Sequence, residues 1–215
     1  MKRQFSAVVR FAALVAAAVA LTTLPSRAEI IDRILAVVDG AIIMQSDVLM
    51  AVRLGLVPGA AASDQISAPL EALIERRLIL EEVDRYAPPD PPDAETDRHL
   101  ADVRARAGAR FDAVLLETGI SVDQLRRHVR DDLRMEAYLQ QRFGTMQPSD
   151  DEIAKYYRDH PAAFTRNGIL APLADVREVV TAELSAERRS TTIHDWITGL
   201  RRRANVNVLP RQPSG

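Results

Sequence analysis

Hydrophobic positions after residue 29 begin with two short apolar runs on either side of an Asp-Gly pair. The runs cover 30–38 and 42–44, and Asp39 and Gly40 lie between them. Apolar runs joined by Asp-Gly are typical of a β-hairpin, because a type I′ turn requires positive φ at both central residues. A two-stranded ribbon is marginal in water, so this hairpin needs a further strand to pair with.

After Ser46 the apolar residues recur at helical spacing. We expect Ser46 to cap a helix of about ten residues. After a connection of small residues, a longer helix is expected over 69–86. It ends at the proline-rich segment 87–93, because proline cannot continue a helix interior. Two short helices follow, the first closing near Gly108 and the second near Gly119.

Two capping boxes mark the best-defined helix starts. In each, a serine oxygen caps the helix and a Gln or Glu three residues later reaches back to the serine N–H. The pairs are Ser121 with Gln124 and Ser149 with Glu152. We expect the first helix to continue to about residue 142, and the second to end before Pro161.

The remaining chain predicts a linker or loop and then one helix of about thirty residues. Val206 and Val208 follow this helix and alternate with asparagines, which is a strand pattern with one apolar face. We expect this strand to complete a three-stranded sheet with the N-terminal hairpin, sending Trp196 and Leu200 back onto the N-terminal module. The alternative is a frayed C-terminal tail.

The first 28 residues have the three parts of a secretory signal peptide. Lys2 and Arg3 precede an apolar stretch over 11–24, and a small-x-small site predicts cleavage between Ala28 and Glu29. The apolar stretch is shorter than a membrane span, although an uncleaved anchor or a buried helix remains the alternative. We therefore expect a soluble, exported protein without stable membrane insertion.

The net charge of the protein argues against nucleic acid as a partner. The formal net charge of −2 becomes −6 when the four basic residues of the signal peptide are removed. A mildly acidic exported protein is not built to hold nucleic acid by its phosphates. The arginine runs at 126–130 and 201–203 are expected to be solvated helix faces rather than a lipid or nucleic-acid patch, because acidic residues or a helix end lie beside them.

Few residues are candidates for catalysis or for metal binding. The chain has no cysteine, and none of its histidines is followed by a second histidine one helical turn later. These histidines, expected to be solvated, are His99, His128, His160 and His194. The acidic pair at 150–151 is explained by the dipole of a helix start. No catalytic residue, metal ligand or cofactor is expected.

Four segments, taken in order, resemble the N-terminal module of the SurA-type periplasmic chaperones. They are IDRILAVVDGAIIMQSDV, LEALIERRLILEEVDRY, GISVDQLRRHVRDDLRMEAYLQQRF and PSDDEIAKYYRDHPAAF. The final DWITGLRRRANVNV resembles the helix and strand that fold back onto that module. The resemblance covers most of residues 30–208. It implies a signal peptide over 1–28, a helical chaperone domain over 29–161, a linker over 162–172 and a C-terminal helix and strand over 173–215.

One departure from that family concerns its enzyme domain. One or two parvulin-type prolyl isomerase domains normally lie between the YYRDHPAAF-like helix and the C-terminal helix. Such a domain needs roughly ninety residues or more, whereas only eight residues separate Phe164 from Leu173. The isomerase activity is therefore not carried over, and what remains resembles the client-binding module alone.

The fold class expected is mainly α, a multi-helix chaperone module with a small β-hairpin completed by a C-terminal strand. The resemblance implies a holdase for unfolded or partly folded envelope or outer-membrane proteins. Flexible Met and amphipathic Tyr suit a promiscuous groove, although each such residue is also a core candidate. The client-binding residues expected on one exposed apolar patch are Met50, Leu54, Leu56, Val57, Tyr156 and Tyr157.

Two other functions stay open at this point. One is a folding factor of the prolyl isomerase family, which an assay on a proline-containing peptide would detect. The other is a dedicated envelope assembly or scaffold subunit, for which a pull-down would give one stoichiometric partner rather than many clients. The sequence favours no particular oligomeric state.

Overall fold

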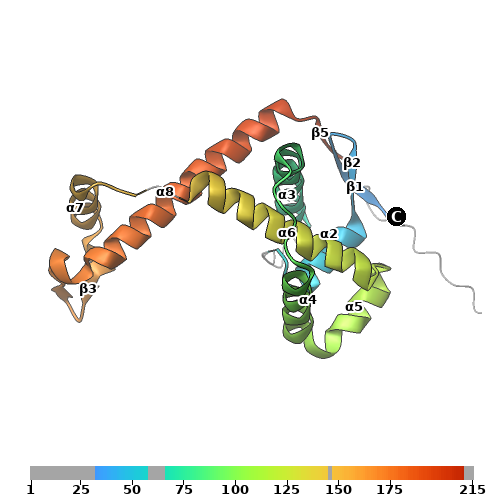
Figure 1. The fold of residues 1–215 in the computed structure, drawn as a ribbon, viewed down its shortest axis with the longest axis horizontal. Helices are drawn as coiled ribbons and strands as arrows, with labels where there is room; N and C mark the ends of the chain where they lie inside the picture. The colour runs from blue at the N-terminus through green and yellow to red at the C-terminus, as the bar shows by residue number, and fades with distance from the viewer. Residues whose placement is uncertain (1–31, 58–65, 145–146, 211–215) are drawn as a thin grey trace, which may run out of the picture. The chain divides into compact units, whose positions relative to one another are not determined.

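The computed structural model describes residues 32–57, 66–144 and 147–210 (Figure 1). It is mainly helical, with two small antiparallel sheets, and this confirms the expected fold class. The expected signal peptide, with its cleavage site between Ala28 and Glu29, lies outside the described residues.

The elements follow one another in the order that the sequence pattern predicts, with one addition before the last helix. They are β1 (Ile34–Val38), β2 (Ala41–Met44), α2 (Gln45–Arg53), α3 (Ser67–Tyr86), α4 (Asp93–Ala107), η1 (Gly108–Arg110), α5 (Phe111–Thr118), α6 (Val122–Phe143), α7 (Asp150–Asp159), η2 (Pro161–Phe164), β3 (Thr165–Arg166), β4 (Ile169–Leu170), α8 (Leu173–Arg203) and β5 (Val206–Val208).

The N-terminal hairpin and the C-terminal strand form one sheet with the order β2-β1-β5 (Figure 1). Asp39 and Gly40 have φ values of 46° and 89°, as the type I′ turn requires. β5 pairs antiparallel with β1, with Val206 opposite Val38. The Asp39 carboxylate also accepts a hydrogen bond from the backbone N–H of Asn205 at 2.8 Å. The expected third strand is confirmed, and it joins the two ends of the described chain.

Both capping boxes form as predicted. The Ser121 N–H donates to the Gln124 side-chain oxygen at 2.8 Å, and the Ser149 N–H donates to Glu152 at 2.7 Å. Each serine oxygen in return accepts the backbone N–H three residues later. These reciprocal bonds satisfy donors that a helix start otherwise leaves unpaired.

The predicted cap at Ser46 is wrong. α2 begins at Gln45, with Met44 rather than Ser46 as its N-cap residue, and Asp47 in its first turn accepts the N–H of Met44 at 2.8 Å. Ser46 lies inside the helix, where its hydroxyl donates to the Asp32 carboxylate. β2 therefore runs into α2 without a break, and an acidic residue replaces the expected serine as the group that satisfies the helix start.

Two adjoining hydrophobic cores hold the N-terminal part together. The first joins the hairpin and α2 to α3 and to Leu200 of α8, with Trp196 packed at its edge. The second joins α2 to α4, α5 and α6 around Phe111 and Leu125. Trp196 and Leu200 therefore return to the N-terminal module, as the sequence predicts.

A separate core links α7 to the first half of α8. It contains Ile153, Phe164, Val176, Val180 and Leu184. α7 thus shares its core with α8, across the segment where the sequence predicts a linker.

That predicted linker is itself structured. Residues 161–170 form the turn η2 and the short hairpin β3–β4, which reverses at Asn167 and Gly168 with φ values of 52° and 78°. Asn-Gly is the strongest short-range signal for such a turn. The expectation of an irregular loop is therefore wrong, because the two flanking strands are too short to show alternation.

Candidate functional site

The predicted client-binding residues of the first helix are part of the core. Met50 and Leu54 are each 3% exposed, and both lie in the cluster that joins α2 to α5 and α6. Leu56 is partly buried against both of these cores, and Val57 against the core with the hairpin. The expected exposure of Met50 and Leu54 is wrong, because α2 is covered by α3 on one side and by α5 on another.

The two predicted tyrosines of α7 belong to a different core. Tyr156 and Tyr157 are partly buried beside Phe164, and the Tyr157 hydroxyl donates to the carbonyl of Ala171 at 2.6 Å. The structure therefore divides the six predicted residues between separate cores and does not bring them together on one exposed patch. Periodicity alone gave no means of distinguishing an inner face from an outer one when helices are covered on more than one side.

An open hollow of about 440 Å³ lies where the connection from α3 to α4 passes α6. Its described lining residues are Tyr86, Ala87, Pro88, Pro89, Tyr138, Gln141 and Arg142. Ala87 ends α3 in the left-handed conformation, with a φ of 43°, and the two prolines that follow cannot continue the helix. Tyr86 is consequently left at the helix end, 60% exposed to solvent.

A series of aromatic rings in contact with one another extends from this hollow into the protein interior. The ring of Tyr86 lies 5.7 Å from that of Tyr138, which lies 6.1 Å from that of Trp196. Phe143 adds a further ring, 5.4 Å from Trp196. Centroid separations of 4.5–7 Å are those at which aromatic pairs attract. Because Tyr138 is buried, its ring is a fixed surface against which the exposed ring of Tyr86 packs.

Arg142 supplies the charge at the hollow. Its guanidinium carbon lies 5.5 Å from the Phe143 ring centroid and 5.6 Å from that of Trp196. One guanidinium nitrogen lies 3.4 Å from the Tyr138 hydroxyl, whose pKa is raised mainly by burial. The hollow thus offers stacking surface, two proline rings and a cation, a combination that suits an apolar or aromatic side chain of a bound polypeptide.

The sequence pattern does not predict this hollow. It places Tyr86 and Tyr138 within helices and the prolines at a helix end. A tyrosine at the last position of a helix, directly before Ala-Pro-Pro, was the available signal, because the helix end leaves its ring without a following turn to cover it.

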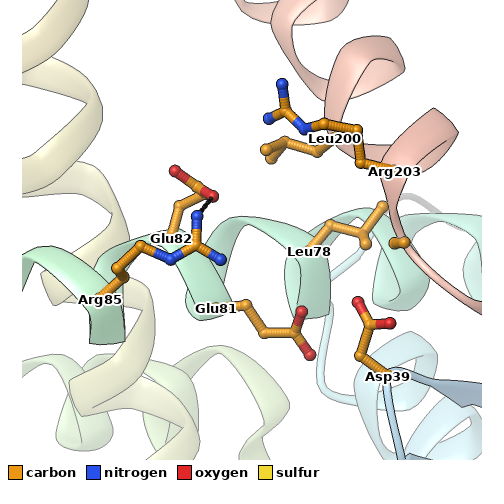
Figure 2. A pocket seen from close by; sticks show the side chains of 8 residues that line it. Asp39, Leu78, Glu81, Glu82, Arg85, Leu200 and Arg203 are labelled. Carbon is orange, nitrogen blue, oxygen red and sulfur yellow. Dashed lines mark hydrogen bonds and ion pairs between the residues drawn. The ribbon is translucent and has the colours of Figure 1, made fainter.

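A second, smaller pocket of about 90 Å³ lies where the hairpin turn, α3 and the end of α8 meet (Figure 2). The carboxylates of Asp39 and Glu81 face each other there, and burial together with the neighbouring Asp39 raises the pKa of Glu81. Leu78 and Leu200 pack nearby. Asp39 of this pocket also accepts the N–H of Asn205, directly before β5.

His128 departs from the expectation of a solvated histidine. Only 14% of its side chain is exposed, and burial, followed by the charge of Arg76, lowers its pKa to about 4. Arg76 donates to the His128 carbonyl at 3.0 Å and to Asp132 at 2.7 Å. The ring therefore belongs to the contact between α3 and α6.

One arginine of each run is paired with carboxylates of a neighbouring helix. Arg126 binds Asp93 and Asp97 of α4, and Arg201 binds Glu71 of α3. Within the described part of the chain, no three His, Asp or Glu side chains gather as they would around a metal ion. No helix among those same residues has the length and apolar character needed to cross a bilayer.

The chain was compared with known proteins at the level of sequence. No protein-family model matches it, and no curated protein matches it either.

Proposed function

We propose that this protein is a periplasmic chaperone that binds unfolded envelope or outer-membrane proteins as a holdase, without catalysing a reaction on them. The observation that carries the proposal is the aromatic hollow, where the exposed Tyr86 ring packs against the buried ring of Tyr138 beside two prolines. Unfolded chains expose the apolar side chains that such a surface binds. Binding them lowers the concentration of free unfolded chain, and so competes with aggregation by mass action.

The ordered segments that resemble SurA-type chaperones support the same proposal. The C-terminal strand, which pairs with β1, is one of the features that the resemblance predicts. Export would follow from the signal peptide expected over residues 1–28. Fractionation of cells, with determination of the mature N-terminus, tests this part, and the proposal requires a periplasmic chain that begins at Glu29.

The holdase activity is tested by replacing Tyr86. We expect Tyr86→Ala to weaken the suppression of aggregation of an unfolded outer-membrane protein severalfold, because the side chain that a client contacts is lost. The fold should be affected little, since Tyr86 is mostly exposed and its one ring pair contributes about 1 kcal/mol. Light scattering during dilution of the client from urea measures the activity, and thermal melting measures the fold.

Leu116→Ala is the matched control, because Leu116 is a large apolar residue of α5 that is 82% exposed and does not line the hollow. The control should protect the client as the wild type does. If the Tyr86 variant also protects fully, the hollow is not the client site. A turnover assay on a proline-containing peptide completes the test, and catalysis above background would contradict a holdase without enzyme activity.

A further inference from the structure

Arg142 differs from other arginines of the same helix in what it contacts. Arg126 and Arg134 of α6 each form ion pairs with carboxylates of neighbouring elements. No such pair holds Arg142 among the residues that the structure describes, where its partners are two aromatic rings and the Tyr138 hydroxyl. It is also the one charged side chain in the described lining of the hollow.

The position of the Arg142 guanidinium over these rings favours binding of an anion. A guanidinium that lies over aromatic rings keeps its in-plane N–H groups available for a carboxylate. Its side chain is already restrained by Phe143, Trp196 and Tyr138, so that less rotamer freedom is lost when an anion binds. The geometry therefore combines an aromatic surface with a restrained guanidinium that forms no ion pair within the described residues.

We propose that the hollow selects client segments in which Asp or Glu lies within one or two residues of an aromatic side chain, with the ring against Tyr86 and the carboxylate at Arg142. This inference rests on the proposed function and names the class of segment that the site prefers. The hollow, about 440 Å³ in volume, is large enough for one aromatic side chain and an adjoining part of the backbone. Because Arg142 is positively charged, a residue beside the client's aromatic side chain is bound more favourably when it is acidic than when it is neutral or basic.

The preference is measured with short peptides that are acetylated and amidated, so that no terminal charge contributes. One carries Phe-Ser-Glu at its centre, and a second carries Phe-Ser-Gln. For the wild type we expect about fivefold tighter binding of the Glu peptide at low ionic strength, the size that a partly exposed ion pair supports. The preference should shrink as salt is added, because salt screens exposed charges.

Arg142→Gln should abolish this preference, so that the Glu and Gln peptides bind to the variant with equal affinity. Arg127→Gln is the matched control: it removes the same charge from an exposed position of α6, fifteen residues away along the helix. It should retain the fivefold ratio. Equal loss of the ratio in both variants would assign the effect to the net charge of the protein and overturn the proposal.

The failure of this inference is distinguishable from failure of the proposed function. If both peptides bind equally well to the wild type and both lose affinity in Tyr86→Ala, the hollow is a client site without an acidic preference, and only this inference is overturned. If neither peptide binds and Tyr86→Ala protects clients fully, the proposed site itself is wrong. A third peptide with Phe at a free C-terminus completes the test, and a preference confined to that terminal carboxylate would also overturn the selection of internal acidic residues.

Discussion

The ring of His128 illustrates how a single residue acquires its properties from its neighbours. It lies between α3 and α6, next to Arg76, and its Nε2 is 3.6 Å from the Asp132 carboxylate. Burial and the charge of Arg76 lower its pKa from 6.5 to about 4, while Asp132 acts in the opposite direction. The unfolded chain therefore takes up a proton as the pH falls through 6.5, and the folded chain does so only near pH 4.

This difference predicts a loss of stability in acid. The free energy of unfolding should fall by about 3 kcal/mol between pH 6.5 and 4 through His128 alone, because each pKa unit corresponds to about 1.4 kcal/mol. In His128→Gln this part of the pH dependence should disappear. Urea unfolding over this pH range measures it, and replacement of the exposed His194 by Gln is the control. Parallel curves for wild type and His128→Gln would contradict the assignment.

β5 shows how much one short element contributes when it closes a sheet. Beyond the strand pairs, the N–H of Leu209 donates to the Leu35 carbonyl at 2.9 Å, and Asp39 exchanges hydrogen bonds with Asn205. A chain that ends after Arg203 loses all of these bonds and uncovers the edge of β1. We expect it to be destabilised by about 3 kcal/mol, or about 10 °C in melting temperature.

A chain that ends after Pro210 is the control for this truncation, because it keeps β5 and all of these hydrogen bonds. It should melt as the full chain does. Thermal melts followed by circular dichroism compare the melting temperatures of the two truncated forms. An unchanged melting temperature after removal of β5 would mean that the hairpin and α3 suffice without a third strand.

At the scale of the whole molecule, α8 connects two hydrophobic cores. Leu184 belongs to the core with α7, and Leu200 belongs to the core with the hairpin and α3. Residues 185–195 of α8, between the two cores, include no buried side chain, whereas Trp196 and Ile197 are partly buried against α3 and α6. A hydrogen bond from Arg188 to Glu152, which lowers the pKa of Glu152 to about 2, strengthens the contact of α8 with α7 only.

The two cores are therefore expected to open separately. Leu184→Ala should weaken its own core by about 3 kcal/mol and accelerate hydrogen exchange in α7, without changing protection of β1. Leu73→Ala, in the core with the hairpin, should have the reverse effect. Hydrogen exchange followed by mass spectrometry resolves the two regions. Equal acceleration in both regions after either substitution would show that the cores unfold as one unit.

The local elements were determined by the sequence alone. Asp39-Gly40 fixed the hairpin turn, the serine capping boxes fixed the starts of α6 and α7, and the prolines after Tyr86 ended α3. Each of these signals acts over three or four residues. The hydrogen bonds and backbone angles that define the turn or helix end therefore lie within that short segment. The pairing of β5 with the hairpin was also predictable, because the hairpin required a third strand and the alternating valines were the only candidate that the pattern offered.

The candidate site was decided by the tertiary structure alone. Met50 and Tyr86 are both apolar or amphipathic residues of helices, yet one is 3% exposed and the other 60%. What separates them is the number of elements packed around each, and these elements come from distant parts of the chain. The hollow likewise exists because α6 and α8 bring Tyr138, Arg142 and Trp196 beside the end of α3. Burial depends on contacts between segments far apart in sequence, and a periodic pattern carries no information about which of its faces those segments cover.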